Sequence, residues 1–211
     1  SHTLPPIVSN ALTIDGGNVP GLVIDGGGVV RLLHVAAPNV TFRLANIELR
    51  RGRGGRVGGC LLAQNPSDPA AASVTLDRVV MRECEARRTS SGEMVAGGAV
   101  HVDRRSVTVV NSRFIGNRAY TDDPALATNA VGGAISVMPI SMHLVHIEDS
   151  HFIGNQVTGS AENGVGCCRA SGAAVDALGT GVLLLRRNRF IDNHADTLDQ
   201  STTWGSVVKS T

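Results

Sequence analysis

The chain has 211 residues, with 19 Lys and Arg against 18 Asp and Glu, so its formal net charge is only +1. This balance excludes a general attraction to nucleic acid or to an anionic membrane, and no nucleic-acid partner is expected. Twenty-five glycines and 3% aromatic residues favour short strands and tight turns. No window of about 18 apolar residues predicts a membrane span, and no basic-then-apolar leader opens the sequence.

The first predicted elements are two short strand-turn units, "LTIDGG" from Leu12 and "LVIDGG" from Leu22. Longer units follow, in which apolar residues recur at every second position. Such alternation predicts strands with one buried face, and no segment has the spacing of a long amphipathic helix. The predicted inward columns are Val40, Val74, Val107, Val145 and Leu183, and two residues later Phe42, Leu76, Val109, Ile147 and Leu185.

A second motif closes each strand region. "FIGN" at Phe114 and at Phe152 and "FIDN" at Phe190 recur thirty-eight residues apart, and the gap-free alignment adds Ile47 and Met81 to the phenylalanine column. We expect these rings to stack inside the fold, about 4.8 Å apart. Three residues after each ring, an asparagine side chain can bond to the same amide in the next unit. The predicted structural ladder consists of Asn117, Asn155 and Asn193.

Clusters of small residues mark a further corner, at Gly58, Gly97, Gly132, Ser171 and Trp204. A unit that cannot bury its own apolar face must stack on copies of itself, with equivalent strands paired in parallel. The predicted fold is all-β: a single-stranded right-handed parallel β-helix (solenoid) with loops projecting from one edge, the handedness following parallel crossovers. We expect residues 1–211 to form one such domain of a longer exported protein, with Val207 on an edge that further rungs or another chain would cover.

These motifs resemble known families. "GGAI" followed by "FxxN" is similar to the paired repeats of chlamydial polymorphic outer-membrane proteins, and the rhythm resembles bacterial secreted β-helix proteins of the pectate-lyase-like class. The resemblance covers roughly residues 12 to 208, and "SGAA" and "WGSV" depart from its pattern. It implies a secreted or cell-surface passenger with adhesive roles.

Catalytic residues are sought among outward carboxylates, His and Arg, because no G-x-S-x-G, H-E-x-x-H, P-loop or C-x-x-C motif is present. If the protein were a polysaccharide lyase or glycoside hydrolase, the candidates would be His101, Asp103, Asp176, Glu148 and Arg186. His101 and Asp103 share one strand face, and Glu148 lies two units from Asp77 in an outward column that we align as Arg43, Asp77, Val110, Glu148 and Arg186. A solvated charged surface is the favoured explanation of these residues, and no catalytic residue is assigned.

Binding residues are expected elsewhere. The run "RRGRGGR" supplies Arg50, Arg51, Arg53 and Arg56, which suit an anionic glycan, although a flexible Gly/Arg corner is the alternative. The variable segments 87–96, 120–131, 158–170 and 196–203 would leave one edge of the solenoid, where binding usually resides. Their candidate residues are Asp122, Asp123, Glu162 and Asn163.

Cysteine and histidine spacing predicts no metal site and no cofactor. Cys60 and Cys84 flank one unit, Cys167 and Cys168 are adjacent in a loop, and either disulfides or buried thiols fit them. His146 and His151 lie on opposite sides of a turn from one another, which disfavours a shared metal, and His143 is a structural or solvated histidine. The function expected is a non-catalytic, adhesin-like protein that binds polysaccharide or a host-surface glycan; a lyase or hydrolase and a structural spacer are the alternatives.

Overall fold

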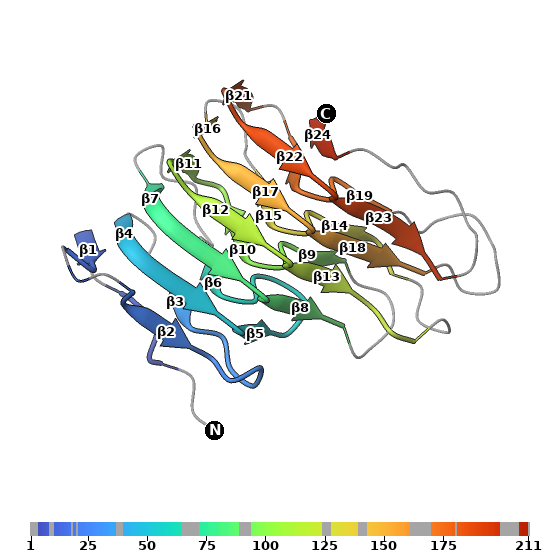
Figure 1. Ribbon diagram of the computed structural model, residues 1–211, viewed down its shortest axis with the longest axis horizontal. Helices are drawn as coiled ribbons and strands as arrows, with labels where there is room; N and C mark the ends of the chain where they lie inside the picture. The colour runs from blue at the N-terminus through green and yellow to red at the C-terminus, as the bar shows by residue number, and fades with distance from the viewer. Residues whose placement is uncertain are drawn as a thin grey trace.

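The fold is a parallel β-solenoid. The computed structural model describes residues 4–8, 11–17, 19, 21–36, 40–64, 72–88, 94–123, 128–138, 143–160, 170–179, 181–198 and 207–210, and contains strands and turns but no helix among them. Every strand pair within its sheets is parallel, and successive copies of the repeat lie side by side in chain order (Figure 1). The all-β solenoid predicted from the repeats is therefore confirmed.

The described strands form four sheets. The ten-stranded sheet contains β1 (Ala11–Asp15), β2 (Val23–Asp25), β4 (Thr41–Arg50), β7 (Ser73–Arg82), β11 (Ser106–Val110), β12 (Arg113–Ile115), β16 (Leu144–Glu148), β17 (His151–Ile153), β21 (Val182–Arg186) and β22 (Arg189–Ile191). The six-stranded sheet contains β3 (Leu33–Val35), β6 (Leu61–Ala63), β10 (Val100–Asp103), β15 (Ile135–Met138), β20 (Val175–Ala177) and β24 (Val208–Ser210). The five-stranded sheet contains β5 (Arg53–Gly54), β8 (Glu85–Arg87), β13 (Arg118–Tyr120), β18 (Gln156–Gly159) and β23 (His194–Thr197), and the three-stranded sheet contains β9 (Val95–Ala96), β14 (Ala130–Val131) and β19 (Ala170–Ser171).

Two columns of left-handed residues bend each rung, a rung being one turn of the solenoid. The first column lies within or beside the ten-stranded sheet, and the second lies where that sheet meets the five-stranded one. Because a positive φ is costly for most side chains, these bends are fixed features of the repeat. The first column is Asn46, Arg78, Asn111, Asp149 and Arg187, and the second is Arg51, Glu83, Gly116, Gly154 and Asp192.

The core is built from the inward residues of the alternating strands. Val107, Val109 and Phe114 are fully buried, as the alternation predicts. The rings of Phe114 and Phe152 stack with centroids 5.0 Å apart, and those of Phe152 and Phe190 with centroids 5.1 Å apart. The spacing follows the distance between adjacent strands, so the strand register holds the rings face over face.

The asparagine ladder expected from the sequence is present. Asn117 Nδ2 donates to Asn155 Oδ1 at 2.9 Å, and Asn155 Nδ2 donates to Asn193 Oδ1 at 2.8 Å. Each amide also donates to a backbone carbonyl of the preceding rung, as Asn155 does to Phe114 O at 3.0 Å. Cys84 takes the ladder position one rung earlier, and its N–H donates to Asn117 Oδ1. The turn is thus fixed by side chains in place of backbone pairs.

A second ladder, which our sequence analysis missed, lies five residues before the first. Ser112 N donates to Ser150 Oγ at 3.1 Å, and Ser150 N donates to Asn188 Oδ1 at 3.0 Å. On the preceding rung Val79 takes this position, and its N–H donates to Ser112 Oγ. The signal was visible in "NSRFIGN", "DSHFIGN" and "RNRFIDN", where Ser, Ser and Asn share one position.

The predicted columns are wrong for the unit that begins at Val40. Val74 pairs with Phe42, not Val40, Leu76 pairs with Leu44, not Phe42, and Met81 pairs with Leu49, not Ile47. A two-residue shift keeps the same side chains inward, so alternation alone could not detect it. The outward column therefore begins with Ala45 beside Asp77; Arg43 still reaches Asp77 diagonally, at 2.5 Å.

The glycine corner needs a one-residue correction at Ser171. Gly172, with φ of 62°, takes the place of Gly132, with φ of 64°, because Ile135 pairs with Val175. The corner also carries the disulfide that the spacing left open: Cys60 and Cys84 are bonded, with Cα atoms 5.6 Å apart. The bond joins Cys60, directly before β6, to Cys84, in the turn that follows β7, across the interior of the solenoid.

Candidate functional site

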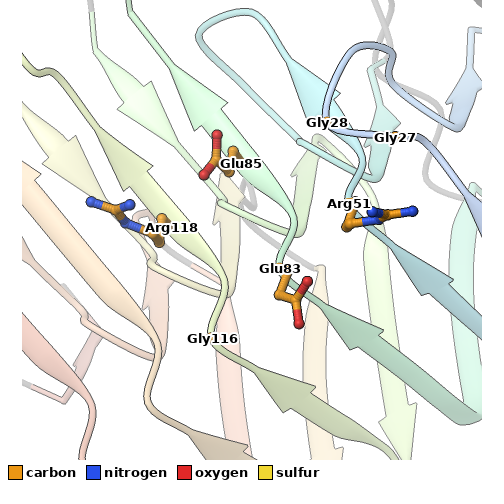
Figure 2. A pocket seen from close by; sticks show the side chains of 7 residues that line it. All are labelled: Gly27, Gly28, Arg51, Glu83, Glu85, Gly116 and Arg118. Atoms are coloured by element: carbon orange, nitrogen blue, oxygen red, sulfur yellow. The ribbon is translucent and has the colours of Figure 1, made fainter.

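The candidate site is a shallow groove of about 390 Å³ along the second left-handed column. Figure 2 shows its polar side chains, which come from separate rungs. Glu83 lies in the turn after β7, Glu85 begins β8, and Arg118 begins β13 on the next rung. Arg51 follows β4 on the preceding rung, and backbone at Gly27, Gly28 and Gly116 completes the lining.

The groove is hollow at Gly116, because glycine has no side chain. A Cβ at Gly116 would meet no atom within 4 Å, and its φ is 60°. The same column carries Arg51 and Glu83 on earlier rungs, so a side chain can be built there at a conformational cost. Glycine relieves that cost and leaves a hollow bounded by the charged residues of the neighbouring rungs. Asn117, directly after Gly116, fixes the turn beneath it.

The groove combines hydrogen-bond donors with acceptors. Glu85 accepts from the Tyr120 hydroxyl at 3.1 Å, and Arg118 stacks over the Tyr120 ring with its Cζ 4.6 Å from the centroid. Arg118 Nε has no hydrogen-bond partner among the residues that the structure describes. Burial, and then the nearby Glu85 carboxylate, raise the pKa of Tyr120, so this hydroxyl stays protonated. The arrangement positions Glu85 and Arg118 as a rigid acceptor and donor.

Arg51 also forms an ion pair with Asp25 at the margin of the groove. It donates in bidentate fashion to Asp25, from Nε to Oδ1 at 2.9 Å and from Nη2 to Oδ2, and Arg50 Nε donates to the same carboxylate at 2.8 Å. The arginines hold the pKa of Asp25 well below its usual range, chiefly through the Arg51 hydrogen bond. Two members of the predicted polyanion-binding run therefore have an internal counter-ion.

The other two arginines of that run differ in their surroundings. Arg53 stands opposite Glu85 in the strand register of β5 and β8, and Arg56 is exposed beyond β5. Of the predicted loop residues, Asp122 is exposed and paired with Arg87, and Asp123 is exposed on the same turn. Glu162 and Asn163 lie outside the described residues, as do residues 89–93, 124–127, 161–169 and 199–203 of the variable segments. The Arg87 hydrogen bond and, more weakly, the charge of Arg53 lower the pKa of Asp122, so the arginine run approaches the loop residues at Arg53.

The strongest catalytic candidates form a buried column on the outer face of the six-stranded sheet. His101 pairs with Ser136 and Ser136 with Asp176, and all three are almost fully buried. In a nucleophilic triad the histidine must lie between serine and carboxylate. Here the serine lies in the middle, and His101 and Asp176 are two rungs, roughly 10 Å, apart. The order prevents Asp176 from orienting the imidazole.

The other candidates are paired or separated. Asp103 is half-buried beside Arg104, with 3.8 Å between Oδ1 and Nε. Glu148 Oε2 lies 2.9 Å from His146 Nε2, its Oε1 accepts a hydrogen bond from Arg187, and Arg186 is exposed next to Glu148 on the neighbouring strand. Asp77 and Glu148 are two rungs apart, as the sequence alignment predicted. None of these geometries places an acid and a base on opposite sides of one bond.

Within the described ranges no group of three or more His, Cys, Asp or Glu side chains could hold a metal ion. The same ranges contain no helix long and apolar enough to cross a membrane. No family model matches the chain, and no curated protein or solved structure matches it. The architecture defines the class of protein, a parallel β-solenoid.

Proposed function

We propose that the protein is a non-catalytic binding solenoid of an exported or cell-surface protein, and that its groove binds a hydroxyl-rich glycan. The observation that carries this proposal is the joint presence of Glu83, Glu85, Arg51 and Arg118 around a hollow with a glycine floor. A sugar hydroxyl both donates and accepts, so it can satisfy carboxylates and guanidinium groups together. A volume of about 390 Å³ suits one or two sugar rings rather than a whole polymer.

The geometry supports binding more than turnover. Glu83 and Glu85 leave the backbone two residues apart, and their carboxylates point away from one another (Figure 2). An acid and base pair would have to face one another across the scissile bond. The Cys60–Cys84 disulfide supports a location outside the reducing cytosol, where such bonds persist.

Calorimetric titration with a panel of neutral oligosaccharides tests the proposal. Glu85→Gln removes the charge at the same side-chain size, and Arg118→Gln removes the charge with a shorter side chain; each should weaken binding about tenfold, because a charge-assisted hydrogen bond is lost. Asp196→Asn is the matched control: it removes an exposed carboxylate from β23 in the same sheet. Failure of every oligosaccharide to bind, or equal weakening by the control, would contradict the proposal.

A further inference from the structure

The outer face of three successive short strands carries a cationic stripe: Arg113, His151 and Arg189. They are direct partners in the register of β12, β17 and β22, and all three side chains are exposed. Each rung advances about 4.8 Å, so the two arginines lie roughly 10 Å apart with the imidazole between them. Arg113 and Arg189 place two positive charges on one face of the sheet, and an anionic partner would neutralise them.

Most other described arginines already have such a counter-ion. Acid partners within salt-bridge distance are present for Arg43, Arg50, Arg51, Arg78, Arg82, Arg87, Arg104 and Arg187. No carboxylate in the described part of the chain pairs with Arg113, His151 or Arg189. The stripe therefore presents two exposed arginines that have no carboxylate partner among the described residues.

An apolar row runs beside the stripe. Ile115, Ile153 and Ile191 occupy the next outward position on the same strands and are half-buried. Directly beneath both rows, the stacked rings of Phe114, Phe152 and Phe190 fix the strands. The surface is thus a rigid strip, cationic along one side and apolar along the other, parallel to the solenoid axis.

We propose that this stripe binds an acidic polysaccharide, with anionic groups on Arg113 and Arg189 and the C–H faces of sugar rings on the isoleucine row. Guanidinium groups match carboxylate and sulfate geometry. An extended peptide returns a side chain to one face about every 6.7 Å, which does not fit arginines roughly 10 Å apart. A nucleic acid carries a phosphate at every nucleotide and would meet Glu148 and Asp149, which precede β17 on the same rung. A polymer with widely spaced charges avoids both conflicts.

Titration of the purified chain with alginate oligosaccharides and with heparin-derived oligosaccharides tests the stripe and separates carboxylate from sulfate. Arg113→Gln and Arg189→Gln should each weaken binding about tenfold, and the double variant should show a smaller dependence of affinity on salt. Arg104→Gln, which removes one partly exposed arginine from the turn after β10, is the charge-matched control and should bind as the parent does.

Several results would overturn this inference: no binding of either polysaccharide, unchanged binding by the double variant, or equal weakening by the control. Tighter binding of duplex DNA or of poly-glutamate through the same two arginines would also overturn it. The stripe does not depend on the groove. Glu85→Gln should leave acidic polysaccharide binding intact, so failure at the groove and failure at the stripe are distinguishable, and thermal melts of each variant confirm that it is folded.

Discussion

Asn155 and Asn193 are joined by a 2.8 Å hydrogen bond between their side-chain amides, and Asn193 Oδ1 also accepts from the Asn155 backbone N–H at 3.1 Å. One oxygen thus bonds both the side chain and the main chain of the preceding rung. Asn155 does the same for Asn117. Replacing one asparagine therefore leaves a buried amide of its neighbour without a partner.

Asn155→Ala should lower the free energy of unfolding by about 1 to 3 kcal/mol, because buried donors at Asn117 lose their acceptor. Gln156→Ala, an outward and partly exposed position on the next residue, should change it by less than about 0.5 kcal/mol. Chemical denaturation of both variants measures the difference. An Asn155→Ala protein as stable as the parent would show that the ladder carries no stability.

A substitution in the second ladder should lower the free energy of unfolding by a smaller amount. Ser150 Oγ accepts from Ser112 N at 3.1 Å and donates to Glu148 O at 2.9 Å. Ser150→Ala should cost about 1 kcal/mol, and Ser150→Asn, which copies Asn188 on the following rung, should restore part of the loss. Denaturation midpoints of the two variants provide the measurement. Equal destabilisation by both would mean that packing, not the ladder, governs this position.

Two glycines should respond very differently to alanine. At Gly133 a Cβ would lie 2.1 Å from Ala173 O and 2.7 Å from Gln156 O, both backbone atoms. Gly133→Ala should therefore cost about 4 kcal/mol or prevent folding. Gly116→Ala meets open space and adds only the strain of a left-handed residue, about 1 kcal/mol. Similar melting temperatures for the two variants would contradict the close corner packing.

Stability should fall on acidification through His101. Burial, with the charges of Arg56 and Arg31, lowers the pKa of His101 to about 4 from 6.5, so the folded state binds its proton less readily than the unfolded state does. This contribution is complete above about pH 6.5 and is lost as pH falls toward 4, by about 3 kcal/mol in all. His101→Leu should show a correspondingly shallower pH dependence, measured by denaturation at several pH values. A parallel dependence in the variant would contradict the burial of a neutral imidazole.

The disulfide offers a fifth test. Cys60 and Cys84 close a segment with a sequence separation of 24, and a loop of this length is stabilised by about 3 kcal/mol when crosslinked. Cys60→Ser with Cys84→Ser should lower stability by about that amount, and reductant should then have no further effect. If reductant left the stability of the parent unchanged, the bond would have no role in folding.

The sequence was sufficient for the parts of the fold that repeat. Phe114, Phe152 and Phe190, and the asparagines three residues later, return at a constant interval, and stacking follows from parallel pairing. Where the repeat is degenerate, as at Ile47 and Ser171, the register was wrong, because apolar alternation tolerates a two-residue slip and small residues are interchangeable by eye. The Cys60–Cys84 pairing needed the three-dimensional position of both residues.

The candidate site was harder to predict for a physical reason. Glu83, Glu85 and Arg118 carry no shared motif, and the groove exists because a left-handed turn brings rungs together where Gly116 lacks a side chain. The arginine run from Arg50 was conspicuous in the sequence, yet Asp25 neutralises its first two members from a strand earlier in the chain. Charge density along a sequence does not reveal such long-range pairing.

Binding in the groove without turnover is tested most directly by one combined measurement. The parent protein and Glu85→Gln are titrated with a neutral oligosaccharide library while reducing ends and unsaturated products are assayed in the same samples. The proposed function predicts saturable binding that Glu85→Gln weakens about tenfold, with no product from either protein. Product formation abolished by His101→Ala or Asp176→Ala would contradict it and assign a lyase or hydrolase, and the absence of any binding would remove the groove as a functional site.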